Sequence, residues 1–181
     1  MPTLTLIDSK YLGLIINRLC YQLIENHNHF EQTVIIGLQP RGVLFAERIV
    51  EKLKSIQPKA NINYGVVDPT FYRDDFRRHD KTLVASPTEI PFDLEGKRVV
   101  LIDDVLFTGR TIRAGIEGMM EYGRPKSVEL LVLIDRRFSR ELPIEPMYIG
   151  LSIDSYDKQK VKVMWKKESG EDKVLLLTDV E

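Results

Sequence analysis

Hydrophobic residues recur along the chain with two different spacings, and the two spacings alternate. Between residues 9 and 26 the apolar positions Leu12, Ile15, Leu19 and Leu23 fall on one face of a helix, which predicts an amphipathic first helix. Short apolar runs at residues 33–38, 61–67, 99–105 and 128–134 predict buried strands, and residues 43–55 and 111–122 predict helices between them. This alternation is typical of an α/β protein with a central parallel, doubly wound sheet flanked by helices.

The two regions that break the alternation are a long central loop and the end of the chain. Residues 68–91 are rich in charge and poor in apolar periodicity, which is typical of a functional lid or of a disordered segment. Three short strands near residues 147–151, 161–165 and 174–177 predict an antiparallel tail that turns at residues 169–171. We expect one domain over residues 1–181, with a lid at about 68–91 and a small hood and tail at about 136–181.

Composition and charge favour a globular protein with no general attraction to nucleic acids or membranes. The chain has 181 residues, of which 43% are hydrophobic and 29% charged, so it can fold around a sizeable core. Its 26 basic and 27 acidic side chains give a net charge of −1, so any nucleic acid or membrane partner needs a local basic patch. Cys20 is the single cysteine and cannot form an internal disulfide, and no segment reads as a signal peptide or membrane span, so we expect a cytoplasmic protein.

The most informative motif follows the predicted strand at residue 99. The apolar run ends in Asp103 and Asp104, and Thr108 and Gly109 then lead into a predicted helix. Parallel strands present such residues at the crevice where α/β proteins bind ligands, and a small polar turn at a helix start offers backbone N–H groups to an anion. Each residue alone also fits an ordinary strand-to-helix turn, but the ordered combination predicts a ribose site and a phosphate site. The predicted phosphate turn consists of Leu106, Phe107, Thr108, Gly109, Arg110 and Thr111.

Two further loops follow parallel strands and are predicted to converge on the same crevice. The first contains Gln39, Pro40, Arg41 and Gly42, in which a permanent cation and a close backbone approach suit a diphosphate, although a turn with a surface arginine fits equally. The second, residues 135–140, begins with Asp135.

The motif at residues 99–111 resembles the phosphoribosyl pyrophosphate (PRPP) binding motif of type I phosphoribosyltransferases. The whole chain is similar to the bifunctional pyrimidine operon regulator and uracil phosphoribosyltransferase family, PyrR. The stretches that carry this resemblance are Tyr-Arg-Asp-Asp at 72–75, the motif continued through Arg-Ala-Gly at 113–115, Tyr-Gly-Arg-Pro at 122–125, Arg-Glu-Leu-Pro-Ile at 140–144 and Tyr-Ile-Gly at 148–150.

The resemblance implies the type I phosphoribosyltransferase fold and the conversion of uracil and PRPP to UMP and pyrophosphate. It implies that the ribose and catalysis depend on Asp103 and Asp104, with Arg73 of the lid supplying charge to the departing pyrophosphate. The lid residues Arg77 and Arg78 are further candidates, and His79 is expected to be a bystander. The resemblance also implies a cis peptide bond in the pyrophosphate loop, for which Gln39–Pro40 is the candidate.

For the base and the metal, the resemblance implies a site after the strand at 128–134. Asp135 is expected to hold Mg²⁺, which accompanies PRPP, and the base is expected to meet Asp135, Arg136 and Phe138. A purine or xanthine phosphoribosyltransferase with the same PRPP site is the alternative enzyme.

Regulatory members of the family bind leader RNA when UMP is present, and the family forms homodimers or larger homo-oligomers. The candidates for an RNA-binding patch are Arg136, Arg137, Arg140 and Arg18, together with Lys10. The loop after Asp135 departs from the family pattern by an extra residue and by lacking a histidine. Glu145, Leu151 and Asp154 replace residues that are basic or neutral in the family, which weakens the electrostatic contribution to RNA affinity. A nucleotide-sensing RNA-binding regulator with little catalysis is therefore a second hypothesis beside the salvage enzyme.

Overall fold

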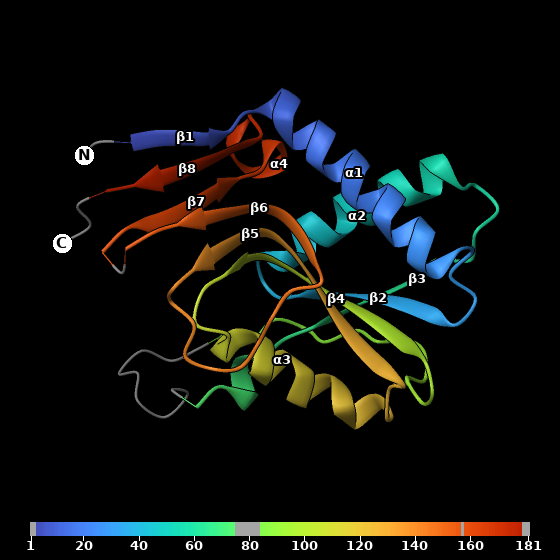
Figure 1. Ribbon diagram of the computed structural model, residues 1–181. Helices are drawn as coiled ribbons and strands as arrows, with labels where there is room; N and C mark the ends of the chain where they lie inside the picture. The colour runs from blue at the N-terminus through green and yellow to red at the C-terminus, as the bar shows by residue number, and fades with distance from the viewer. Residues whose placement is uncertain (1–2, 75–83, 157, 179–181) are drawn as a thin grey trace.

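Strands and helices alternate through most of the chain, as the hydrophobic spacing predicts (Figure 1). The computed structural model describes residues 3–74, 84–156 and 158–178. None of the helices in these ranges has the length and apolar composition that crossing a bilayer requires. The elements are β1 (Thr3–Ile7), α1 (Ser9–His27), β2 (Thr33–Leu38), α2 (Gly42–Ile56), β3 (Asn63–Val67), η1 (Thr70–Tyr72), β4 (Arg98–Leu106), α3 (Arg110–Met119), η2 (Met120–Tyr122), β5 (Ser127–Arg137), β6 (Tyr148–Asp154), β7 (Lys160–Met164), α4 (Lys166–Ser169) and β8 (Lys173–Leu177).

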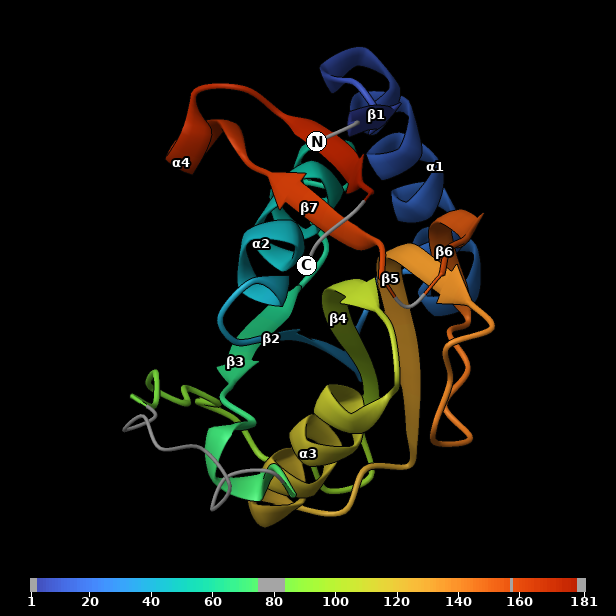
Figure 2. The ribbon, with the colours of Figure 1, turned by 90° about the vertical axis from the view of Figure 1, so that its left-hand side faces the viewer.

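Five parallel strands form the central sheet in the order β3-β2-β4-β5-β6. Helices α1 and α2 cover one face and α3 covers the other, as the two perpendicular views show (Figure 2). Because neighbouring residues of a strand point to opposite faces, Ile35 and Ile102 join the core with α1 and α2, whereas Ile36 and Leu101 join the core with α3. The predicted doubly wound parallel sheet is confirmed.

The strand order creates a crevice at one point of the sheet. The chain passes from β2 to β3 on one side, and then crosses to β4 on the other side of β2. Connections therefore leave β2 and β4 in opposite directions, which opens a crevice beyond their carboxyl ends. The residues that the sequence predicts to bind PRPP lie at the carboxyl ends of these two strands or just after them.

A second, antiparallel sheet of β1, β8 and β7 lies beside the carboxyl ends of the central strands (Figure 1). It is fixed to α2 by the Phe45 and Trp165 rings, whose centroids are 5.8 Å apart, and by two donors of Arg48 that bind Asp172 at 3.0–3.1 Å. The predicted antiparallel strands near 161–165 and 174–177 are confirmed. Strand β1 was not predicted, because five residues of alternating Thr and Leu give too short a pattern to identify.

The prediction that residues 147–151 belong to the antiparallel tail is wrong. Strand β6 pairs in parallel with β5 and forms the edge of the central sheet. An irregular connection over residues 138–147 replaces the helix that usually joins parallel strands. Close packing fixes the strand there, since a Cβ on Gly150 would lie only 2.4 Å from the Leu133 carbonyl oxygen and 3.0 Å from Ile15 of α1.

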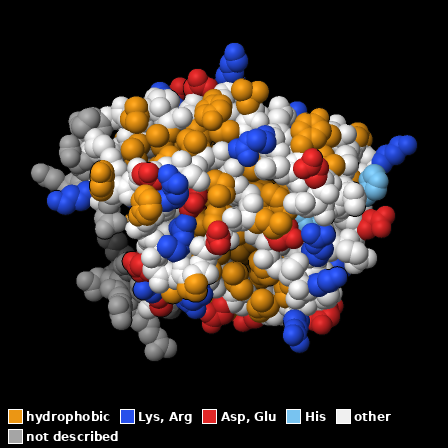
Figure 3. Space-filling view, viewed as in Figure 1, with side chains coloured by type: hydrophobic (Ala, Val, Ile, Leu, Met, Phe, Trp, Pro, Cys, Tyr) orange, Lys and Arg blue, Asp and Glu red, His pale blue; other side chains and the backbone are white. Residues whose placement is uncertain are grey.

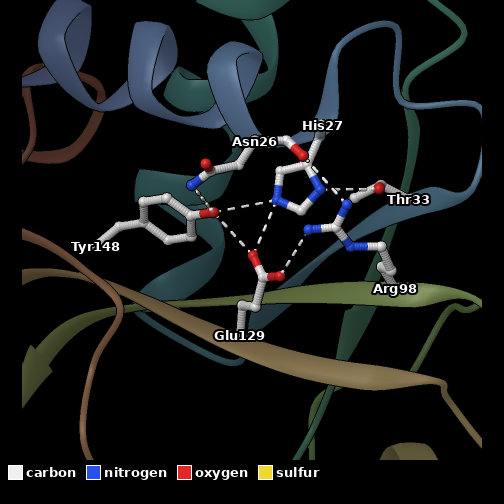
Figure 4. A network of polar contacts seen from close by, with 6 residues as sticks. All are labelled: Asn26, His27, Thr33, Arg98, Glu129 and Tyr148. Atoms are coloured by element: carbon white, nitrogen blue, oxygen red, sulfur yellow. Dashed lines mark hydrogen bonds and ion pairs between the residues drawn. The ribbon is translucent and has the colours of Figure 1, made fainter.

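At the amino ends of the central strands, a buried polar network joins α1 to the sheet (Figure 4). The Tyr148 hydroxyl donates its only proton to Glu129 at 2.8 Å, so neutral His27 donates from Nε2 to the same carboxylate at 2.9 Å. Its Nδ1 then accepts from the Thr33 hydroxyl at 3.0 Å. Burial lowers the pKa of His27, although Glu129 opposes this effect. Burial would raise the pKa of Glu129, but hydrogen bonds from Tyr148 and Arg98 outweigh burial and lower it.

Candidate active site

Two adjacent acids lie at the carboxyl edge of the sheet, beside the crevice. Asp103 and Asp104 are 8% and 6% exposed, and Oδ1 of Asp103 accepts a hydrogen bond from the Asp104 backbone N–H at 2.8 Å. Strand β4 continues to Leu106, so the pair lies within the strand, just before the end that the sequence predicted.

The two carboxyl groups share an environment that opposes their ionisation. Burial raises the pKa of Asp103 well above its usual value, and the Asp104 carboxylate raises it further. Burial also raises the pKa of Asp104, while the Arg41 guanidinium opposes the rise. A ligand that brings hydroxyl donors or a cation to this pair would compensate the buried charge.

The loop after β2 supplies the cation beside these acids. Arg41 donates from Nε to Asp104 at 3.1 Å, and from Nη2 to the carbonyl of Val163 in β7. It therefore joins the loop, the acids of β4 and the small sheet. The Gln39–Pro40 peptide bond in this loop is cis, as the sequence predicts.

Gly42 allows β4 and the start of α2 to approach closely. A Cβ on this residue would lie 2.6 Å from the Ile102 carbonyl oxygen and 2.9 Å from Oδ1 of Asp103. The sequence assigned the glycine to a close approach between backbone and ligand. In the structure, Gly42 makes its close approach to β4 within the protein, and it thereby sets how near Arg41 comes to Asp103 and Asp104.

The turn between β4 and α3 has the form that the phosphate prediction requires. Gly109 caps α3 with a φ of +90°, a conformation that favours glycine. The Thr108 hydroxyl accepts from the Arg110 backbone N–H at 3.3 Å. The first backbone N–H groups of an α-helix have no partner within the helix, so Thr111 and its neighbours begin α3 with donors suited to an anion.

The described part of the predicted lid has two attachments: Glu89 pairs with Val66 of β3 through its backbone, and residues 70–74 contact α3. Arg73 and Asp74 follow η1 and are exposed. Asp74 pairs with Arg110, and Arg113 donates to the Tyr72 carbonyl at 2.6 Å. The other lid candidates, Arg77, Arg78 and His79, lie outside the described residues.

The predicted base site lies at the end of β5, which is longer than predicted and includes Asp135 and Arg136. Asp135 is 6% exposed and pairs with Arg140. Phe138 is 84% exposed, with a φ of +67°, beside a cavity of about 400 Å³ that is also lined by Asp154 and Tyr156.

The arginines proposed for RNA all bind groups within the protein. Arg136 is 5% exposed, donates to Ser155 at 2.8 Å and lies 4.0 Å from the centre of the Phe107 ring, so it is not available at the surface. Arg137 pairs with Asp154, and Arg18 donates to the carbonyls of Ile149 and Gly150 at 3.1 and 2.7 Å. Arg140 pairs with Asp135, and Lys10 is exposed on α1.

The donors at the crevice fit magnesium only in part. Carboxylate oxygens of Asp103, Asp104 and Asp135 are of the type that Mg²⁺ prefers. Over the described ranges, however, no three His, Cys, Asp or Glu side chains are grouped closely enough to hold a metal ion. A magnesium ion here would need further ligands from a bound diphosphate and from water, which is its usual mode with phosphate substrates.

Comparison with known proteins identifies the family. Residues 5–168 match the model of the phosphoribosyl transferase domain. The bifunctional protein PyrR of Desulfosudis oleivorans is 39% identical over 172 residues, covering 95% of this chain and 94% of the relative, and that of Gloeothece citriformis is 41% identical, covering 95% and 96%. The chain belongs to the PyrR family of phosphoribosyltransferases. A hypoxanthine phosphoribosyltransferase structure from Staphylococcus aureus has a TM-score of 0.66 at 19% identity, covering 84% of this chain and 79% of that one, and confirms the type I fold.

Sequence reasoning missed the contacts around the phosphate turn. The stretch at 140–144 identified the PyrR family, but no role was assigned to Glu141 or Ile144. In the structure Glu141 pairs with Arg110, and a Cβ on Gly109 would lie 3.0 Å from Ile144. The family stretch at 140–144 was the signal that could have pointed to these contacts, but the residues that it contacts lie about thirty positions earlier in the chain.

Proposed function

We propose that the protein transfers the phosphoribosyl group of PRPP to uracil, giving UMP and pyrophosphate. The observation that carries this proposal is the placement of two buried acids directly before a glycine-capped helix start, at the switch point of the sheet. A pentose 5-phosphate offers hydroxyl donors to such acids and an anion to such a helix start. The curated relatives named bifunctional protein PyrR support uracil as the base.

The chain's own groups suggest a division of roles. Asp103 and Asp104 accept hydrogen bonds from the ribose hydroxyls, and the N–H groups of residues 108–111 bind the 5-phosphate. Arg41, with Gln39, Pro40 and Gly42, faces the pyrophosphate as its oxygen leaves the anomeric carbon with the bonding electron pair. A uracil nitrogen bonds to that carbon, and its proton passes to the departing pyrophosphate or to water. Magnesium, bound with PRPP, would neutralise part of the diphosphate charge, and Asp135 is its candidate protein ligand.

The lid and the base site complete this proposal. Arg73, which follows η1, would approach the pyrophosphate and supply positive charge as that group leaves. The base would be bordered by Asp135, Arg136 and Phe138. Because Arg136 is buried, its role would be to position its neighbours. We further propose that residues 1–181 act as one domain in a homodimer or larger homo-oligomer, in the cytoplasm, where the buried free thiol of Cys20 is compatible with a reducing environment.

A turnover assay tests the proposal directly. The protein is incubated with PRPP, Mg²⁺ and one base at a time from a panel of uracil, hypoxanthine, guanine and xanthine, and nucleotide product is measured. We expect UMP from uracil and little product from the purines. Product from a purine alone would favour the alternative enzyme, and no product from any base would overturn the proposal.

RNA-binding regulation is the second candidate, and it is favoured by the word bifunctional in the names of relatives that match nearly the whole chain. The charges give it less support. On the face shown in Figure 3, Lys and Arg side chains are interspersed with Asp and Glu rather than gathered into one patch. Gel shifts with the leader RNA of a pyrimidine operon, with and without UMP at fixed salt, test this function. RNA affinity that depends neither on UMP nor on the RNA sequence would exclude RNA-binding regulation.

A further inference from the structure

The connection between β5 and β6 holds the phosphate turn through two consecutive carbonyl groups. We call residues 140–142 the clamp segment. The backbone N–H groups of Glu141 and Leu142 donate to the Thr108 carbonyl at 3.0 and 3.2 Å. The Arg140 side chain donates from Nη1 to the Phe107 carbonyl. Three consecutive residues therefore bind both carbonyls at the start of the turn.

This arrangement determines where the N–H groups of the turn point. In a trans peptide unit the carbonyl of one residue and the N–H of the next point in opposite directions. Among the described residues the cis bond is Gln39–Pro40, so the units after Phe107 and Thr108 are trans. With both carbonyls turned toward the clamp segment, the N–H groups of Thr108 and Gly109 point away from it. If the first peptide unit rotated, a carbonyl oxygen would replace an N–H donor and repel an anion.

Arg140 connects this turn to the other side of the site. Its Nη2 donates to Oδ1 of Asp135, and the two side chains are only 23% and 9% exposed. The planar guanidinium can hold two acceptors in fixed directions at once, which a lysine ammonium cannot reproduce. A second arginine, Arg136, lies 4.0 Å from the centre of the Phe107 ring and restrains the same residue.

We propose that Arg140 is a positioning residue for phosphoribosyl transfer, which orients the phosphate turn by holding the Phe107 carbonyl while Asp135 holds Arg140. The inference rests on the proposed function, because it assumes that the turn binds the 5-phosphate. It assigns Arg140 to the interior of the site instead of to an RNA-binding surface, where the sequence had placed it.

Ribose 5-phosphate is the probe that tests this role, because it carries the phosphate and the ribose without base or diphosphate. Its Kd is measured by calorimetry for the wild type, Arg140→Met, Arg140→Lys and a control, Lys167→Met. Lys167 is an exposed cation that pairs with Glu47 at the surface. The KM for PRPP, kcat and the thermal unfolding midpoint are measured for the same four proteins.

We expect Arg140→Met to raise the Kd for ribose 5-phosphate and the KM for PRPP about tenfold or more, as loss of a charged hydrogen bond would. The variant Arg140→Lys should recover only part of this loss, and Lys167→Met should stay within about twofold of the wild type, since exposed ion pairs contribute little. If Arg140→Met fails to fold, Arg140→Lys decides the question.

Three results would overturn the inference. They are a wild-type Kd in Arg140→Met, full recovery in Arg140→Lys, which would show that charge alone acts, and an equal loss in Lys167→Met. Failure of the proposed function is distinguishable, because the wild type itself would then neither bind ribose 5-phosphate nor form UMP.

Discussion

Replacing Gly42 with alanine should damage both stability and PRPP binding, because the added methyl group has no free space. Its Cβ would lie 2.6 Å from the Ile102 carbonyl oxygen and 2.9 Å from both Cα and Oδ1 of Asp103, where ordinary contacts begin at 3.4 Å. The overlaps are thus 0.8 Å and 0.5 Å, and they involve β4 backbone and a buried carboxylate instead of a flexible side chain. Strand β4 or the start of α2 must therefore move.

The expected size of the effect follows from this overlap. Overpacking of this kind costs about 1–3 kcal/mol, and each kcal/mol lowers the unfolding midpoint by about 2–4 °C in a protein of this size. Displacement of Asp103 should also lower kcat/KM for PRPP by about 10- to 100-fold, as misplaced site residues do.

Gly13→Ala is the matched control, because Gly13 lies within helix α1 and a Cβ there would meet no atom within 4 Å. This change should stabilise the protein by about 0.5–1 kcal/mol and leave kinetics unchanged, since alanine is the better helix former. Differential scanning calorimetry and PRPP kinetics on both variants are the assays. If Gly42→Ala behaved like Gly13→Ala in both, the close approach of α2 to the acids would be wrong.

Two further predictions concern charge. Arg41→Met removes the cation that opposes the raised pKa of Asp104. As pH is lowered, kcat/KM for PRPP should therefore begin to fall at a higher pH than in the wild type, and an unshifted acid limb of the pH profile would contradict the pairing of Arg41 with Asp104. His27 and Glu129 both have lowered pKa values, so at these two groups the unfolded chain binds more protons than the folded one, and the stability that they contribute should fall as pH drops from about 7.5 to 4.5, whereas the raised pKa values of Asp103 and Asp104 act in the opposite direction. In urea unfolding, the difference in free energy of unfolding between the wild type and His27→Gln should fall as pH drops from about 7 to 5, with the same change at the exposed His29 as the control.

The sequence predicted those parts of the fold that depend on local patterns. Strand β2 has the predicted bounds, and α1 differs by one residue, because apolar spacing identifies elements whose faces are buried. The two acids and the glycine turn could be singled out because they lie close together in one motif, and the family resemblance implied a cis bond that proline placed after Gln39.

The parts that were missed depend on partners far away in the chain. The parallel pairing of β6 could not be read locally, because the connection at 138–147 has no helix to indicate a crossover. The burial of Arg136 depends on Ser155 and on residues near it, and the role of Arg140 depends on Phe107, 33 residues earlier. A single sequence shows that such arginines are charged, but it does not show which carbonyl they bind.

The central claim is that Asp103 and Asp104 hold the ribose of PRPP, and the affinity of the double variant Asp103→Asn/Asp104→Asn for PRPP in the presence of Mg²⁺ tests it most directly. Titration calorimetry should show a loss of about 100-fold or more, as removal of two charged hydrogen bonds predicts. The variant should unfold at the same temperature as the wild type or a higher one, because burial opposes ionisation of both carboxyl groups. An unchanged affinity for PRPP in the folded variant would contradict the claim.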